Sequence, residues 1–298
     1  MTRWAPIIAV VVLRAGPVVA DHDIAVAYTA APGSATVDGD LGEWAAADWI
    51  ALDEVYSGGP TDVTDARYCL RWSDADNLLY VAVEVTDTEQ NLEPAYTTWN
   101  GQDDIEVSVD AGNNTAYFEG DMTKGQQIMF GAAPGGTDWV IASWGNPVGT
   151  DLVPAYAVVV DGDVIRYEAA IVPYSHYSGW SGDDQQAVVD LAADVELGFD
   201  VVAVTKLDDG TYGMLTNNLV GGKFQQGSAL QKWVLGTAGC NPGDADADGD
   251  VDLDDFVILK TNFGTTEGTT CDMGDFDGDG DVDLDDFVLL KTNFGTTY

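Results

Sequence analysis

Two nearly identical aspartate-rich segments near the C-terminus limit most strongly what this chain can fold into. GDADADGDVDLDDFVILK begins at Gly243 and GDFDGDGDVDLDDFVLLK begins at Gly274, so the pattern repeats after 31 residues. An acidic residue stands at nearly every second position, and like charges at this spacing repel one another. A calcium ion takes about six to eight oxygen ligands, which alternate carboxylates in a loop can supply. The sequence therefore predicts two calcium-binding loops.

The spacing fits the EF-hand loop, which has ligands at positions 1, 3, 5, 7, 9 and 12 and glycine at position 6. Gly249 and Gly280 occupy position 6, and Val251 and Val282 supply the apolar residue that follows position 7. A solvated acidic tail is the alternative, but it explains neither glycine. The predicted ligands, with a backbone carbonyl serving at position 7, are Asp244, Asp246, Asp248, Asp250, Asp252 and Asp255, and then Asp275, Asp277, Asp279, Asp281, Asp283 and Asp286.

A helix is predicted after each loop, because apolar residues recur there at intervals of three and four. The predicted apolar stripes are Leu253, Phe256, Leu259 and Phe263, and then Leu284, Phe287, Leu290 and Phe294. Before the loops stand CNPG and CDMG, which cannot form the entering helix of an ordinary EF-hand. Repulsion among the carboxylates makes the folding of this segment dependent on the metal.

Two loop-plus-helix units of this kind resemble a type I dockerin, and the predicted dockerin domain covers residues 240–298. The resemblance implies two Ca²⁺ ions and a cohesin domain as the partner. It also implies cohesin contacts at loop positions 10 and 11 and in the helix that follows. Leu and Asp stand at positions 10 and 11, where clostridial dockerins have small hydroxyl residues, and a calcium-stabilised cap without a cohesin is the alternative. The implied contacts are Leu253, Asp254, Lys260 and Thr261, and in the second copy Leu284, Asp285, Lys291 and Thr292.

The N-terminal segment MTRWAPIIAVVVLRAGPVVA has the form of a secretory signal peptide, residues 1–20. Arg3 precedes the apolar run, and small residues lead up to Ala20. A retained membrane anchor is the alternative, although the run is short for a span and Arg14 interrupts it. We expect a secreted protein that is extracellular or at the cell surface. In an oxidising compartment Cys240 and Cys271 can form a disulfide, although repeat symmetry alone also places them there, and Cys69 is left over.

Residues 23–236 show the alternation of half-buried antiparallel strands rather than helical periodicity. ARYCLRW, LLYVAVEV and DIEVSVD each place apolar residues on one face, and the other face of DIEVSVD carries Asp104, Glu106 and Ser108, which we expect to be exposed. Asp161-Gly162 and Asp209-Gly210 are hairpin signals. The predicted fold is mainly β: an antiparallel β-sandwich, immunoglobulin-like or DOMON-like, followed by the small α-helical calcium-binding domain.

Three stretches of the sandwich resemble family 9 carbohydrate-binding modules and their DOMON-like relatives. They are SATVDGDLGEWAAADWIALD, LRWSDADNLLYVAVEVTD and WNGQDDIEVSVDAGNN. The resemblance implies a saccharide ligand, with Trp99 stacking on the sugar and Glu106 and Asn217 as its hydrogen-bond partners. Two departures stand out: Val220 occupies the place of the family's second tryptophan, and Met129 lies nearest a family arginine. Trp99 as a packed rim residue is the alternative, whereas Trp44 and Trp72 are predicted to be core.

Other functions are disfavoured by composition. With 51 acidic and 11 basic residues the net charge is −40, which argues against nucleic acid or an anionic membrane as the partner. DOMON relatives include haem-binding modules, but His22 and His176 are the only histidines available as ligands. No hydrolase motif is present, so we expect no catalytic residues. The sequence thus predicts a non-catalytic carbohydrate-binding protein, docked through a calcium-dependent dockerin and acting in polysaccharide breakdown. A structural surface protein without sugar binding and a glycoside hydrolase accessory are the alternatives.

Overall fold

The computed structural model describes residues 28–44, 49–59, 62–92, 101–113, 124–133, 137–142, 151–177, 186–236, 241–246, 249–266, 269–276 and 280–297. The predicted signal peptide, Trp99, Asp248, Asp277 and Asp279 lie outside these ranges. Within them, no helix has both the length and the apolar character needed to cross a membrane.

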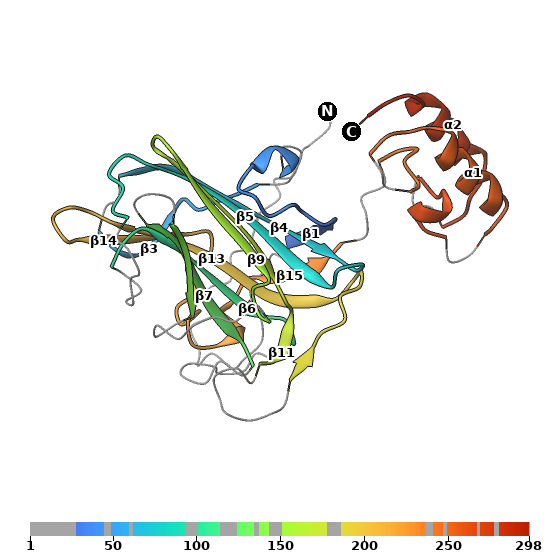
Figure 1. Ribbon diagram of the computed structural model, residues 1–298. Helices are drawn as coiled ribbons and strands as arrows, with labels where there is room; N and C mark the ends of the chain where they lie inside the picture. The colour runs from blue at the N-terminus through green and yellow to red at the C-terminus, as the bar shows by residue number, and fades with distance from the viewer. Residues whose placement is uncertain are drawn as a thin grey trace, which may run out of the picture.

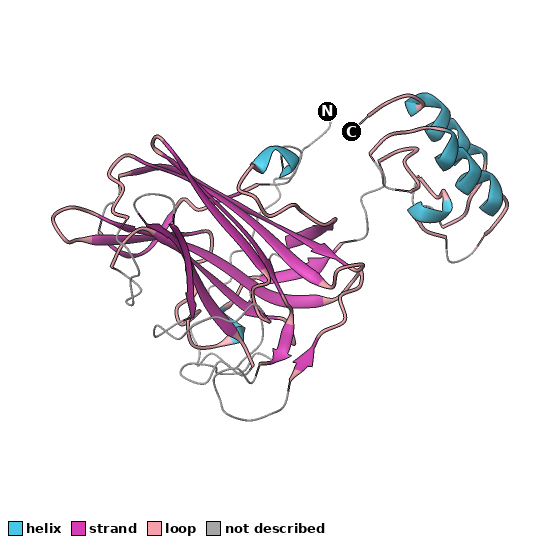
Figure 2. Ribbon diagram, viewed as in Figure 1, coloured by secondary structure: helices cyan, strands magenta, loops and turns pink. Residues whose placement is uncertain are grey.

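The first part of the described chain is built from β-strands, with two short 3₁₀ helices, η1 (Leu41–Trp44) and η3 (Gly227–Ala229). Figure 2 shows strands on one side and the two longer helices on the other. The strands are β1 (Tyr28–Pro32), β2 (Ile50–Ala51), β3 (Glu54–Gly58), β4 (Val63–Ser73), β5 (Leu78–Asp87), β6 (Asp104–Asp110), β7 (Gln126–Ala133), β8 (Thr137–Ala142), β9 (Ala155–Asp161), β10 (Val164–Ile171), β11 (Tyr174–His176), β12 (Ala187–Val188), β13 (Glu196–Lys206), β14 (Tyr212–Thr216) and β15 (Lys232–Leu235).

These strands form two layers. Sheet A has the order β8-β7-β6-β13-β15, with β14 on β13 and β3 on β14. Sheet B has the order β4-β5-β10-β9, with β2 on β4, and β11 and β12 pair only with each other. Strand β1 joins them, because Tyr28–Ala30 pair in parallel with β15 and Ala31–Pro32 pair in parallel with β4. Figure 1 shows the two layers facing each other. The predicted sandwich is therefore present, and β1 supplies its parallel pairings.

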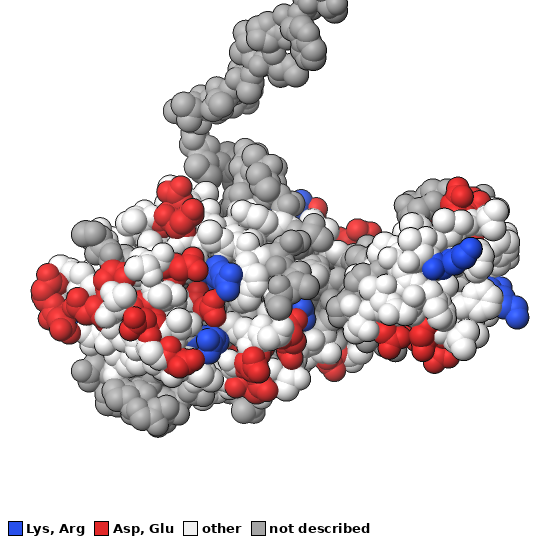
Figure 3. Space-filling model, turned by 90° about the horizontal axis from the view of Figure 1, so that it is seen from above, with Lys and Arg blue, Asp and Glu red and all other residues white. Residues whose placement is uncertain are grey.

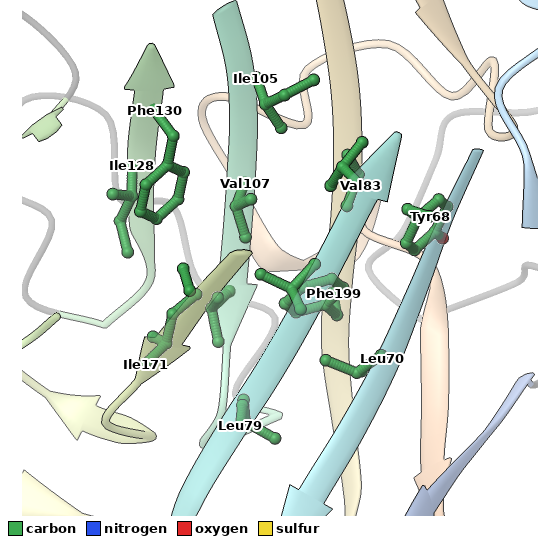
Figure 4. Close-up of a cluster of buried hydrophobic side chains, with 14 of the residues drawn as sticks. Tyr68, Leu70, Leu79, Val83, Ile105, Val107, Ile128, Phe130, Ile171 and Phe199 are labelled. Atoms are coloured by element: carbon green, nitrogen blue, oxygen red, sulfur yellow. The ribbon is translucent and has the colours of Figure 1, made fainter. Parts of the chain in front are cut away.

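The alternating patterns place their apolar faces between the sheets, as predicted. In Figure 4 the labelled side chains of both layers point toward a common interior. Trp72 lies in this core, whereas Trp44 is buried in a smaller cluster with Cys69, Tyr80 and Ala82. The core members from the three quoted strand patterns are Ala66, Tyr68, Leu70 and Trp72 in β4, Leu79, Val81, Val83 and Val85 in β5, and Ile105, Val107 and Val109 in β6.

The prediction for the other face of β6 is wrong. Asp104, Glu106 and Ser108 are 1%, 5% and 5% exposed, so both faces of this strand are covered. A two-residue alternation shows which residues share a face, but only the packing of remote segments determines whether that face meets water.

The two predicted hairpins are confirmed, with one difference in the turn. Strand β9 ends at Asp161 and β10 begins at Val164, so Gly162 and Asp163 form the loop. Gly162 has φ of +61°, whereas Asp161 and Asp163 do not have positive φ. A positive φ at the first central residue alone is the pattern of a type II′ turn, which glycine favours.

The C-terminal segment has a separate hydrophobic core. Helix α1 (Leu253–Asn262) and helix α2 (Leu284–Asn293) pack together, with the 3₁₀ helix η4 (Cys271–Met273) between them in sequence. Half of each predicted stripe is correct: Leu259 and Leu290 are buried, and the Phe256 and Phe287 rings lie 6.1 Å apart. The other half is wrong, because these stripe residues lie on the solvent side: Leu253, Phe263, Leu284 and Phe294.

The cysteines differ in state. Cys69 is buried and is not part of a disulfide, whereas Cys271 is disulfide-bonded. Cys240, the remaining cysteine of the chain, lies outside the described residues.

Candidate functional site

The first aspartate loop gathers three of its predicted ligands. One carboxylate oxygen each from Asp244, Asp246 and Asp255 lie within 4.8 Å of one another. Asp244 and Asp255 are 3% and 1% exposed, and Oδ1 of Asp244 is buried without a hydrogen bond. Buried carboxylates of this kind require a cation or several donors. The oxygen set, all carboxylate, is of the type that calcium prefers.

The second loop gathers a different subset. Carboxylate oxygens of Asp281, Asp283 and Asp286 lie within 4.8 Å of one another, and Asp275 is also buried. Asp281 joins this group through its side chain, whereas the sequence predicted its backbone carbonyl as the ligand. The equivalent Asp250 and Asp252 are not in the first group. Asp252 and Asp283 cap their helices in the same way, by accepting from the N–H groups of Asp254 and Asp285 at 2.7 Å. The two loops thus supply overlapping ligand positions, with position 12 common to both.

The position-12 aspartates connect each helix to the start of its loop. Asp255 Oδ1 accepts from the N–H of Ala245 at 2.6 Å, and its Oδ2 accepts from the N–H of Asp252 at 2.7 Å. Asp286 repeats this pattern with Phe276 at 2.7 Å and Asp283 at 2.8 Å. Both helices therefore begin with a reciprocal capping box, which satisfies backbone donors of the first turn.

The charge balance of this segment cannot be met from its own side chains. Residues 240–298 contain 16 acidic residues and only two basic ones, Lys260 and Lys291. Both lysines lie in the last turn of a helix and are exposed. In Figure 3 the basic side chains of this segment are separate from its acidic ones. Burial of four aspartates here thus favours a cation from outside the chain.

All eight predicted cohesin contacts lie on exposed surface. Leu253 and Leu284 are 65% and 62% exposed, and Val257 and Val288 extend each apolar strip one turn along the helix. The remaining positions are also exposed: Asp254, Lys260, Thr261, Asp285, Lys291 and Thr292. Contact of exposed leucine and valine side chains with water is unfavourable. A partner that buries these side chains is therefore stabilised by the hydrophobic effect.

A second candidate site lies on the outer face of sheet A. Glu106 on β6 accepts a hydrogen bond of 2.9 Å from Nε2 of Gln127 on β7. Burial raises the pKa of the Glu106 carboxyl to about 7, although Gln127 and Lys223 favour its charged form. On the same face both oxygens of Asp104 are buried without a hydrogen bond, and burial holds the pKa of this carboxyl well above its usual range.

A buried ion pair adjoins this face. Nζ of Lys223 donates to Asp200 at 2.9 Å and to Oγ1 of Thr216 at 2.7 Å. The Asp200 carboxylate also accepts from Nδ2 of Asn218 at 2.6 Å and from the N–H of Gln231 at 3.0 Å. Burial lowers the pKa of Lys223, and the Asp200 charge opposes this. The pair fastens residues 217–231 to sheet A.

This network was not predicted, although the sequence contains one signal for it. Lys223 is one of only 11 basic residues and follows two glycines in an otherwise apolar stretch, LVGGKF. A lysine in such a setting tends to bury its stem and needs an acidic partner.

The predicted sugar ligands do not all converge. Oδ1 of Asn217 accepts from the Tyr68 hydroxyl of sheet B at 3.3 Å, while the neighbouring Asn218 belongs to the Lys223 network. Trp99 lies outside the described residues. Val220 and Phe224 are 43% and 39% exposed, which places two apolar side chains at the surface of this loop.

Comparison with known proteins assigns the fold. No family model and no curated protein matches the chain. A solved structure of a family 9 carbohydrate-binding module from Caldicellulosiruptor kristjanssonii in complex with cellotriose gives a TM-score of 0.54 at 18% identity, covering 71% of this chain and 94% of that one. A structure of such a module with glucose, from the same organism, gives 0.53 at 18% identity, covering 71% and 97%. The sandwich has the fold of a family 9 carbohydrate-binding module. This likeness confirms the predicted fold class of the sandwich, and at 18% identity it establishes the fold alone.

Proposed function

We propose that this chain is a secreted, non-catalytic carbohydrate-binding protein that a calcium-dependent dockerin attaches to a cohesin-bearing scaffold or surface. The observation that carries the proposal is the pairing of two units in one chain. One is a sandwich with the fold of a carbohydrate-binding module, and the other is a small segment with two aspartate clusters and two matching exposed helix faces. Such a protein brings a saccharide to a scaffold that acts in polysaccharide breakdown.

The sugar-binding half is supported by the chemistry of sheet A as well as by its fold. Glu106 and Gln127 supply a carboxylate and an amide on β6 and β7, and Val220 and Phe224 expose apolar side chains in the loop that Lys223 anchors; saccharides require both kinds of group. The solved neighbours hold cellotriose and glucose, so gluco-oligosaccharides are the first ligands to test.

The docking half is supported by repetition. Asp255 and Asp286 make the same two backbone contacts, and Leu253 and Leu284 are exposed to nearly the same extent. Two Ca²⁺ ions would be held by the predicted aspartates, and either helix face could then meet a cohesin. The four contact positions of the first copy carry the same residues as the four of the second copy.

Affinity electrophoresis in gels containing β-glucan, xylan or mannan tests the sugar half. We expect retardation of the wild-type chain and weaker retardation of Trp99→Ala and Glu106→Gln. Migration unchanged by every polysaccharide would favour a structural surface protein. Release of reducing sugar from any of these polymers would overturn the non-catalytic assignment.

A pull-down with immobilised cohesin domains tests the docking half. We expect capture in millimolar calcium and release on addition of chelator. Failure of capture by cohesins encoded in the same genome would leave a calcium-stabilised cap as the function of this segment.

A further inference from the structure

Sheet B carries a pocket that is distinct from the Glu106 face of sheet A. Its volume is about 500 Å³, within the range of small-molecule sites. Three strands of sheet B supply the floor, and the segment around η1 supplies a wall. The lining residues are Asp40, Leu41, Gly42, Trp49, Arg67, Glu84 and Arg166.

The floor is a row of three charged side chains on neighbouring strands. Arg67 on β4 and Arg166 on β10 both stand directly opposite Glu84 on β5 in the strand register. Glu84 Oε1 accepts from Nη2 of Arg67 at 2.7 Å, and Oε2 accepts from Nε of Arg166 at 3.3 Å. One carboxylate thus orients two guanidinium groups along the floor.

This row retains hydrogen-bonding capacity. Each guanidinium carries five N–H donors, and the contacts with Glu84 use only part of them. Nε of Arg67 is buried without a hydrogen-bond partner. The Arg67 and Arg166 side chains are 42% and 29% exposed, so the pocket can be reached by donors other than the buried Nε of Arg67.

An aromatic ring lies against the same guanidinium. Cζ of Arg67 is 4.7 Å from the ring centroid of Trp49, and Nε1 of Trp49 donates to the Trp44 carbonyl at 3.1 Å. The hydrogen bond and the cation–π contact hold Trp49 in place beside the polar row.

The wall is held rigidly over the sheet. Glu168 of β10 accepts from the N–H groups of Asp38 and Gly39 at 3.0 and 2.9 Å and from Nε1 of Trp44 at 2.7 Å. Gly39 has φ of +82°, and a Cβ there would lie 2.4 Å from Cγ2 of Val159. A wall fixed by a buried carboxylate and a required glycine is preorganised, which lowers the entropic cost of binding a ligand.

The charges of the pocket indicate an uncharged ligand. Arg67 and Arg166 balance Glu84 and Asp40, so the lining is neutral overall, and the chain as a whole carries −40. Acidic side chains predominate on the sandwich face drawn in Figure 3. Anions are therefore repelled at long range, whereas a ligand with hydroxyl groups can use both the donors and the acceptors.

We propose that this pocket is a second saccharide site, which takes a neutral sugar on the Arg67–Glu84–Arg166 row beside Trp49. The proposal extends the proposed sugar-binding function to the opposite sheet but depends on none of the residues of the Glu106 face. A chain with sites on both sheets could bridge two polysaccharide strands.

The arginine signals provide a direct test. The sequence has five arginines, but Arg3 and Arg14 lie in the predicted signal peptide, so the ¹⁵N spectrum of the secreted protein contains three Nε–Hε signals, from Arg67, Arg71 and Arg166, which single substitutions assign. Cellotriose, xylotriose and mannotriose are added separately to about 20 mM, which detects Kd values in the millimolar range. Arg71 is the matched control, because it lies on the same strand with its guanidinium 4.6 Å from the Trp44 ring but does not line the pocket.

We expect at least one trisaccharide to shift the Arg67 and Arg166 signals and to leave Arg71 unchanged. Arg67→Met should weaken that binding about tenfold, and Arg71→Met should not change it. The same titrations of Glu106→Gln separate the two sites: persistent Arg67 and Arg166 shifts in this variant support the pocket even if the Glu106 site fails. No shift with any trisaccharide, equal shifts at Arg71, or unchanged affinity in a folded Arg67→Met variant would overturn the proposal.

Discussion

Asp255 accepts a hydrogen bond of 2.6 Å from the backbone N–H of Ala245, so the first turn of α1 is fastened to the beginning of the loop before it. The same carboxylate belongs to the candidate calcium cluster. The Asp255 side chain thus holds the loop by hydrogen bonds and would also bind the ion. Loop geometry and metal affinity are therefore coupled at this residue.

Asp255→Ala should weaken both calcium binding and the stability of the helical segment. The variant loses hydrogen bonds to three backbone N–H groups, those of Ala245, Asp246 and Asp252, and one carboxylate ligand. We expect a loss of about 1–3 kcal/mol in the unfolding free energy of the segment. Calcium titration calorimetry and chemical unfolding measure the two effects. The neighbouring Asp254→Ala is the control, since Asp254 is exposed. Equal calcium affinity in the two variants would contradict the assignment.

Removal of calcium should unfold the helical segment and spare the sandwich. The buried residues of the helical segment's core all come from 245–290, whereas those of the main sandwich core come from 30–235. The two cores are therefore independent. We expect the helical circular dichroism to disappear in excess chelator while the tryptophan fluorescence of the sandwich stays native. A helical signal that survives chelation at low ionic strength would show that the aspartates need no metal.

Cohesin binding should depend on either of two equivalent faces. Leu253→Asp or Leu284→Asp alone should reduce affinity by about twofold, because one face remains. The double variant should lose binding, because both exposed apolar strips then carry an extra charge. Surface plasmon resonance against a cohesin that captures the wild type measures this. If one single variant abolishes binding, only one face is used.

Lys223→Met should destabilise the sandwich far more than Lys232→Met, which removes a partly exposed ion pair. Asp200 would keep a buried charge without its cation, at a cost of about 3–5 kcal/mol. The Lys232–Glu196 pair, at 2.5 Å with side chains 27% and 43% exposed, provides the comparison. Lys232→Met should cost about 0–1 kcal/mol. Similar urea midpoints for the two variants would mean that the buried network contributes little.

Glu106 should make the stability of the sandwich fall as the pH rises. Its folded pKa of about 7 lies above the unfolded value, so the folded state binds the proton more tightly. The contribution is complete below about pH 4 and is lost as the pH rises to about 7, by roughly 3 kcal/mol. Glu106→Gln should flatten this part of the profile in urea unfolding, and the exposed Glu54→Gln should not. An unaltered slope in Glu106→Gln would place the titration elsewhere.

The sequence predicted what depends on local periodicity. The inward faces of β4, β5 and β6, both hairpins, and the position of both helices follow from alternation, turn residues and apolar spacing, and the structure has them all. Leu253 and Phe263 show the limit of this reasoning. The predicted stripe from Leu253 to Phe263 spans nearly three helical turns. The segment is small, so Leu259 is buried and Phe256 is partly buried, whereas both ends of the stripe face solvent.

What the sequence could not predict depends on remote segments meeting. Glu106 alternates like a solvent-facing residue, and its burial arises from chain segments distant in sequence. The Arg67–Glu84–Arg166 row requires three strands in register, and Arg166 lies 82 residues after its partner Glu84. Neither relationship leaves a local signal, because it is fixed by sheet topology rather than by neighbouring residues.

Strand β1 has a consequence for architecture beyond this protein. It enters the sandwich beside β15, the strand by which the chain leaves, so the entry and exit points of the module are adjacent. A module with neighbouring ends can be inserted into a loop of another protein, or rejoined end to end and opened elsewhere, without rearranging its layers. Any such graft must retain Tyr28–Pro32, because that short strand is the seam between the sheets.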